Sequence, residues 1–193
     1  MPNITLFLAS STAARAQAKA LMSSLSTEYV KFLPWWEAFT PGRTLLAELD
    51  ALRTRVQGAL LLISPESTSV VRGKQVTVPN LNVLFEFGFY YGAFPKERVA
   101  IVKYGEFYLP SDLGGYIHIS GSASFRRGGA LRVAKRTKTE FGRWVESPGF
   151  SSPSSLPQQA AQSGSPYLLT KEDNQRLLNG GRRVISPGLG RDW

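Results

Sequence analysis

The feature that most constrains the fold is a series of short apolar runs separated by segments with helical spacing. Residues 58–64 (GALLLIS) are apolar almost throughout, which is typical of a central parallel strand buried on both faces. Residues 4–9 (ITLFLA) and 98–102 (RVAIV) repeat this pattern. Because such strands alternate with helices, the sequence predicts an α/β fold, with a parallel sheet of about five strands and helices on both faces.

The intervening segments complete this prediction. Leucines recur at helical spacing between residues 44 and 56, so an amphipathic helix is expected there. Further helices are predicted at residues 13–25, 80–94 and 130–145, and shorter strands at residues 29–33 and 116–119. Two loops are predicted, one with large aromatic side chains at residues 34–42 and a polar one at residues 65–79.

Composition divides the chain of 193 residues into two parts. Pro, Ser and Gln dominate residues 148–166, a composition typical of linkers. We therefore predict one domain over residues 1–147, followed by a linker and C-terminal tail over residues 148–193. The tail contains one expected short helix, at residues 170–178, and is too short for a sensor domain.

The net charge of +9 is unevenly distributed. Residues 121–150 carry seven Lys or Arg residues against two acids, most of the excess. The basic segment, residues 126–143, could bind polyphosphate or nucleic acid, but a solvated helix face is the more common explanation. The sequence shows no cysteine, no signal-like N-terminus and no run near the ~20 apolar residues that span a bilayer. A cytoplasmic protein without membrane association is therefore expected.

Metal and cofactor chemistry have little support in the sequence. The single histidine, His118, lies in an apolar, strand-like run, where a structural role is more common than metal ligation. No nucleophile elbow, Walker loop or GxGxxG motif is present. Neither a metal nor a bound cofactor is therefore expected.

The strongest candidate for chemistry is a glutamate inside an apolar helix. Glu86 follows Leu84 and Phe85 and precedes Phe87, where an ionised carboxylate is costly unless it meets a buried donor or serves a functional pocket. Asn82 lies four residues earlier, on the same helical face. An acid in such a setting is more often structural than catalytic, and the residue pattern alone leaves both roles open.

Several segments recur in the order found in one known family. They are residues 6–11 (LFLASS), Trp36 with Phe39, residues 42–44 (GRT), 72–73 (RG), 82–88 (NVLFEFG), Gly92, 98–99 (RV) and 109–113 (LPSDL). Over residues 3–145, the chain thus resembles the prokaryotic TIR-like nucleotide-binding family, which includes the TIR domains of anti-phage signalling effectors. The NVLFEFG and LPSDL segments at this separation are specific only in combination.

The resemblance implies a flavodoxin-like TIR fold and cleavage of the nicotinamide–ribose bond of NAD+, which is the substrate rather than a cofactor. It places the catalytic glutamate at Glu86. It further implies self-association into a homo-oligomer or filament. Because the tail is too short for a sensor domain, we expect activation through a separate sensor or activator protein, or through the tail itself. The substrate-binding candidates that follow by position are Ser10, Ser11, Trp36, Phe39, Arg43 and Asn82.

Three functional hypotheses remain open at this level. The first is an NAD+ glycohydrolase acting in anti-phage defence. The second is a TIR cyclase that makes a cyclic ADP-ribose-type signal, which differs only in whether water or an adenine nitrogen captures the ribosyl centre. The third is a non-catalytic TIR-like scaffold, in which Glu86 is a structural acid.

Overall fold

A computed structural model describes residues 3–109, 113, 116, 118–125 and 131–151. Its centre is a parallel sheet of five strands in the order β2-β1-β3-β6-β7. This order confirms the predicted α/β class and the flavodoxin-like arrangement. The strands are β1 (Ile4–Ala9), β2 (Val30–Pro34), β3 (Gly58–Ile63), β6 (Val99–Tyr104) and β7 (His118–Gly121).

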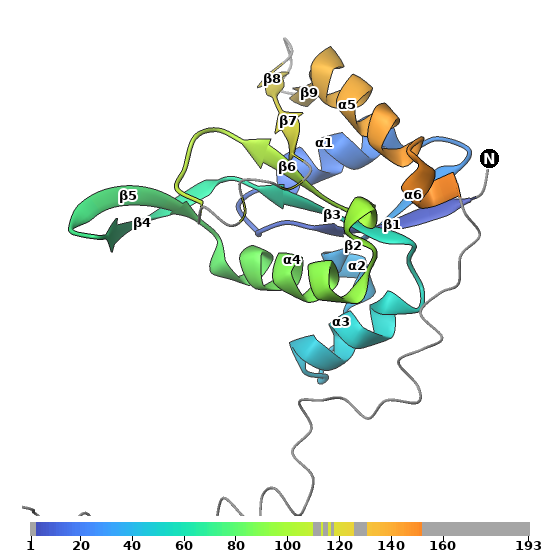
Figure 1. Ribbon diagram of the computed structural model, residues 1–193, viewed down its shortest axis with the longest axis horizontal. Helices are drawn as coiled ribbons and strands as arrows, with labels where there is room; N and C mark the ends of the chain where they lie inside the picture. Colours follow the sequence, from blue (N-terminus) through green and yellow to red (C-terminus); the bar gives the residue numbers. More distant parts are fainter. Residues whose placement is uncertain (1–2, 110–112, 114–115, 117, 126–130, 152–193) are drawn as a thin grey trace, which may run out of the picture. The chain divides into compact units, whose positions relative to one another are not determined.

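Helices cover both faces of this sheet (Figure 1). One face packs against α1 (Arg15–Leu25) and α5 (Lys135–Val145), and the other against α2 (Trp35–Ala38), α3 (Leu45–Arg53) and α4 (Leu81–Ala93). A short 3-10 helix, η1 (Lys96–Arg98), leads into β6. Among the described residues, no helix is both long and apolar enough to cross a membrane.

The two helical layers explain why the central strands are apolar throughout. In β3, Leu60 and Leu62 contribute to the core under α1 and α5, whereas Leu61 and Ile63 contribute to the core under α3 and α4. Successive side chains of a strand point to opposite faces, so both sets must be apolar. The continuous run that predicted a buried strand is therefore the consequence of two separate cores.

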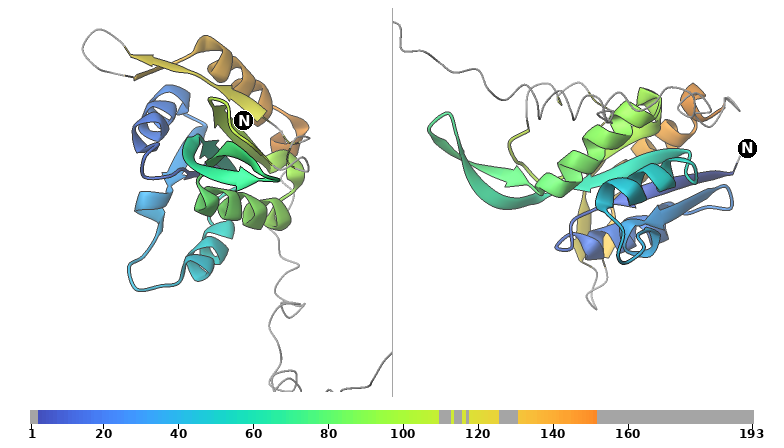
Figure 2. Two further views of the ribbon diagram at one scale, coloured as in Figure 1. Left: turned by 90° about the vertical axis from the view of Figure 1, so that its left-hand side faces the viewer. Right: turned by 90° about the horizontal axis from the view of Figure 1, so that it is seen from below.

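The prediction of a polar loop at residues 65–79 is wrong. These residues form a hairpin of β4 (Pro65–Val71) and β5 (Lys74–Pro79), which projects from the body of the domain (Figures 1 and 2). Arg72 and Gly73 make its two-residue turn with φ values of 51° and 75°, as a type I′ turn requires. The side chains of β4 are mostly exposed, and in β5 only Val76, Val78 and Pro79 are partly or fully buried, so the hairpin lacks the continuous apolar runs that identify the central strands.

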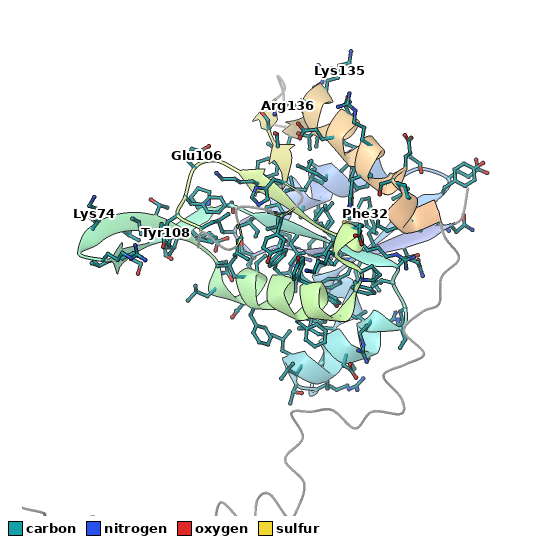
Figure 3. All side chains as sticks on the ribbon, in the orientation of Figure 1. Phe32, Lys74, Glu106, Tyr108, Lys135 and Arg136 are labelled. Atoms are coloured by element: carbon teal, nitrogen blue, oxygen red, sulfur yellow. The ribbon has the colours of Figure 1, made fainter. Side chains whose placement is uncertain are left out.

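The basic helix predicted at residues 130–145 begins later than expected. Its first part is strand β9 (Leu131–Val133), which pairs antiparallel with β8 (Ala123–Phe125), and α5 starts at Lys135. Helix α5 buries Phe141 and Trp144, while Lys135 and Arg136 extend into solvent (Figure 3). The described basic residues, on β9 and on α5, are thus exposed to solvent, whereas residues 126–130 lie outside the described residues.

The packed structure continues past residue 147. Residues predicted to begin the linker instead form helix α6 (Pro148–Ser151). The ring of Phe150 is buried edge-on against Trp144, with their centroids 5.2 Å apart, and Arg98 donates to the Gly149 carbonyl at 2.8 Å. The tail prediction for residues 152–193, with its helix at 170–178, lies outside the described residues, as does most of the 109–113 segment.

Candidate functional site

A pocket of about 240 Å³ opens at the carboxyl ends of β1 and β2. In this sheet β2 lies on one side of β1 and β3 on the other, so the strand order reverses at β1. The pocket therefore lies near this switch point, where flavodoxin-like sheets bind ligands. The lining residues come from the β1–α1 loop, α2 and its C-cap, and the first turns of α3 and α4. They are Ser10, Ser11, Thr12, Trp35, Phe39, Leu45, Asn80, Asn82, Val83 and Glu86.

The acidic side chain in this wall is Glu86. It is 7% exposed, and its Oε2 atom has no hydrogen-bond partner among the described residues. Burial raises the pKa of the Glu86 carboxyl to about 7. An acid with this pKa exchanges its proton near neutral pH, a property that general acids and bases of active sites share.

A second orphaned polar group lies one helical turn further along α4. Tyr90 is fully buried, and its hydroxyl has no hydrogen-bond partner among the described residues. Its ring stacks with Phe94 and tilts against Phe7 at a centroid distance of 5.0 Å. Burial and the nearby charge of Glu86 both raise the pKa of the Tyr90 hydroxyl, so this hydroxyl stays protonated. The interior beside Glu86 is thus largely aromatic, which explains the carboxyl's poor solvation.

The start of α4 fixes Glu86 in place. Asn80 is the N-cap, and its Oδ1 accepts from the backbone N–H groups of Asn82 and Val83 at 3.0 and 3.4 Å. The Nδ2 of Asn80 donates to Oε2 of Glu66 in the hairpin at 3.1 Å. Asn82 and Glu86 share the pocket face, as their spacing predicts. The N-cap and its contact with the hairpin therefore determine where α4 begins, and so where Glu86 lies.

Hydroxyl and indole groups form the opposite wall. Ser10 and Ser11 directly follow β1 and are both buried. The indole Nε1–H of Trp35 donates to Oγ of Ser10 at 3.2 Å, and Oγ of Ser11 accepts from the Ala14 backbone N–H at 3.1 Å. Serine hydroxyls and free N–H groups at a helix start are ligands suited to an anionic or hydroxylated molecule.

The structure brings together five of the seven predicted site residues and separates the other two. Trp36 packs beside the α1 and α5 core, with the Arg15 guanidinium 4.8 Å from its ring centroid. Arg43 forms an ion pair with Glu48 at 3.0 Å and does not line the pocket. The buried Glu48 also accepts from the Thr40 backbone N–H at 3.0 Å, so this pair holds the loop before α3.

Sequence reasoning missed Trp35, Thr12, Leu45, Asn80 and Val83 as lining residues. The choice of Trp36 over Trp35 illustrates the difficulty, because the predicted loop is a short helix in which neighbouring side chains point about 100° apart. Only one of two adjacent tryptophans can then face the pocket. Asn80 did have a signal, since Asn before an apolar helix is a preferred N-cap.

The wall of the pocket carries little charge. Glu86 is the one charged residue among the described residues that line it. Within the described part of the chain, no three His, Asp or Glu side chains gather closely enough to hold a metal ion. His118 lies in β7, where burial and Lys103 lower its pKa.

Comparison with known proteins gives weak but consistent matches. The chain is 30% identical over 86 residues to CD-NTase-associated protein 12 of Sphingobacterium faecium, covering 45% of this chain and 27% of that protein. It is 28% identical over 91 residues to Protein tirC of Dictyostelium discoideum, covering 41% and 45%. It is 27% identical over 78 residues to the uncharacterized protein YuaY of Escherichia coli, covering 39% and 26%. The matches thus span less than half the length of each relative.

A family profile extends further than these pairwise matches. The profile described as CAP12/Pycsar effector protein, TIR domain, matches residues 5–123. That range includes every residue that lines the pocket, with Glu86 among them. Since it also covers well over half of the chain, the chain belongs to the CAP12/Pycsar effector TIR domain family.

Proposed function

We propose that this protein is an NAD+ glycohydrolase that cleaves the nicotinamide–ribose bond and serves as an effector in anti-phage defence. The observation that carries the proposal is Glu86, a buried carboxyl with an unpartnered oxygen and a pKa of about 7 in the wall of a pocket. Membership of an effector TIR family supports it from a second direction.

The electrostatics of the pocket fit this reaction. The nicotinamide ring of NAD+ is cationic, so its arrival favours the ionised form of a nearby acid. As the glycosidic bond breaks, positive charge moves onto the ribose, and a carboxylate in a poorly solvated wall stabilises that charge strongly. Glu86 can supply the carboxylate without help from a metal, and hydrogen bonds from the ribose hydroxyls would satisfy its free oxygen.

The size of the pocket limits which part of the substrate enters. A volume of about 240 Å³ is below the roughly 300–1,000 Å³ typical of sites that enclose a whole ligand. We propose that the nicotinamide riboside end enters beside Glu86 and that the pyrophosphate lies near Ser10 and Ser11 at the start of α1. The ring of Trp35 or Phe39 is then available to stack on the nicotinamide.

The relatives also suggest how the enzyme is used. The name of the Sphingobacterium relative associates that protein with a CD-NTase. We propose that this chain, too, responds to a signal from a separate protein, acts in the cytoplasm where NAD+ is available, and is active as a homo-oligomer. Water is the proposed acceptor of the ribosyl centre.

The proposal is tested by incubating the purified protein with NAD+ over a range of protein concentrations and measuring products by mass spectrometry. We expect equal amounts of nicotinamide and ADP-ribose. A cyclic product would mean that an adenine nitrogen, rather than water, captures the ribosyl centre and that the enzyme is a cyclase. Unchanged NAD+ at every concentration, and with a co-purified CD-NTase system added, would exclude the enzymatic function.

The two adjacent tryptophans provide a matched prediction about substrate binding. Trp35→Ala removes a ring from the pocket wall and the indole donor to Ser10, whereas Trp36→Ala removes a ring of similar size outside the pocket. Loss of one stacking and one hydrogen-bonding contact should raise the KM for NAD+ by ~10-fold or more for Trp35→Ala. Steady-state kinetics of both folded variants should show no such change for Trp36→Ala. Equal effects would contradict the proposed pocket.

A further inference from the structure

The hairpin of β4 and β5 has an edge that the rest of the described structure leaves open. The two strands form a separate sheet that projects from the body of the domain (Figure 2). Their side chains are mostly exposed, with Val70 69% exposed. A two-stranded hairpin with so little buried surface is only marginally stable in water. Additional strands alongside it would supply the missing backbone and side-chain contacts.

The register of the hairpin determines which backbone groups face outward. Val71 and Lys74 flank the two-residue turn, so in a hairpin of this type they bond to each other. The pattern alternates along the strand, which directs the N–H and C=O groups of Thr68 and Val70 away from β5. A contact of β5 confirms this alternation of inward and outward groups. Thr77 lies opposite Thr68, and its outward carbonyl accepts from the Tyr108 backbone N–H at 2.8 Å.

The two edges of the hairpin thus have different neighbours. Tyr108, in the segment after β6, lies against the β5 edge (Figure 3). The β4 edge has no paired strand among the described residues. Between Ser67 and Val71 it also lacks the charges and prolines that usually protect such an edge from pairing.

We propose that β4 pairs antiparallel with β4 of a second copy of this chain, around a two-fold axis at Ser69. In this register Thr68 lies opposite Val70 of the second copy, so the outward N–H and C=O groups of both residues are satisfied in both chains. The two β4 strands and the two β5 strands then form one four-stranded antiparallel sheet. Opposed β-branched side chains add to its stability.

Charge complementarity selects this register. With Ser69 on the axis, Glu66, in the irregularity between Pro65 and Ser67 at the base of one hairpin, comes near Arg72 at the tip of the other, and the same pair repeats across the axis. Arg72 has a φ of 51°, a conformation that favours glycine, asparagine or aspartate. A guanidinium held at this turn despite that preference is explained by a carboxylate partner at the tip.

A cysteine scan tests the axis directly, because the chain has no cysteine of its own. Ser69→Cys places two thiols opposite each other at a Cα separation of roughly 4.5–5.5 Å, within disulfide range. The matched variant Ser67→Cys, on the same exposed strand, separates the two thiols by about four residues, or ~13 Å. Under mild oxidation we expect Ser69→Cys to form the covalent dimer at least ~10-fold faster.

Charge reversal provides a second, independent test of the same pairing. Arg72→Glu and Glu66→Arg should each weaken dimerisation measured by light scattering, whereas the double variant should restore it. Rescue is informative because the double variant still lacks the bond from Asn80 to Glu66. Monomers at all concentrations, or equal crosslinking of the two cysteine variants, would overturn the proposal. Both assays omit NAD+, so their outcome is separate from that of the glycohydrolase assay.

Discussion

Replacing Glu86 by glutamine should abolish nicotinamide release, with a fall in kcat of at least ~100-fold. The substitution keeps the shape of the side chain and removes its ability to carry a negative charge. The transition state then loses the carboxylate that stabilises the ribosyl cation, whereas the proposed contacts of the substrate with Ser10, Ser11 and Trp35 are kept. We therefore expect the effect mainly in kcat and only weakly in KM.

The control for this prediction is Glu106→Gln, which removes an equal charge at a side chain that is 94% exposed and outside the pocket. Its activity should match that of the wild type. Circular dichroism and thermal unfolding establish that both variants are folded. Substantial activity in a folded Glu86→Gln protein would assign the chemistry to another residue and return Glu86 to a structural role.

The same assignment predicts a pH dependence of the rate. The Glu86 carboxyl has a pKa of about 7, and the proposed chemistry needs its ionised form. The value of kcat/KM should therefore rise as the pH increases through about 7 and then level off. Bound NAD+ carries a cationic ring, so the profile of kcat should have its midpoint at lower pH than that of kcat/KM.

Much of the fold follows from the sequence because the central strands are buried on two sides. Residues 6–9 and 59–63 are apolar at consecutive positions, a pattern that few other environments produce. The hairpin at residues 65–79 has no such constraint, since β4 is mostly exposed and β5 is only partly buried. Its signal was the two-residue turn at Arg72 and Gly73, which is weaker than Asn-Gly because arginine rarely occupies that conformation.

The residues of the candidate site likewise include some that spacing in the sequence could place and others that it could not. Asn82 and Glu86 lie on one helix, where spacing alone determines that they share a face. Trp35 and Trp36 lie in a four-residue helix and Arg43 lies in the loop after it. In such a helix, choosing the neighbouring residue turns the side chain by about 100° and so away from the pocket. The ion pair of Arg43 with Glu48 depends on how the loop meets α3, which sequence spacing does not determine.

Glu86→Gln should also stabilise the protein at alkaline pH and have little effect near pH 4.5. In the folded protein the carboxyl has a pKa of about 7, against a normal value of 4.5. Between these values the folded state binds more protons than the unfolded state, so the stability of the wild type falls as the pH rises through this window. A shift of this size corresponds to about 3 kcal/mol, and the glutamine variant, which does not titrate, lacks this loss.

The measurement is the free energy of unfolding of both proteins in urea from about pH 4.5 to 8, taken as a difference at each pH so that other titrating groups cancel. The difference should grow in favour of Glu86→Gln and level off above pH 7. Glu140→Gln provides a control of opposite sign, because hydrogen bonds from Arg136 and Ser120 lower the Glu140 pKa and favour its ionised form. This variant should be less stable than the wild type by a nearly constant amount over the same range, since its own pH dependence falls below pH 4.5. Parallel curves for wild type and Glu86→Gln would mean that the carboxyl is solvated or paired in solution. In that case the pocket would lose the electrostatic property on which the proposed catalysis depends.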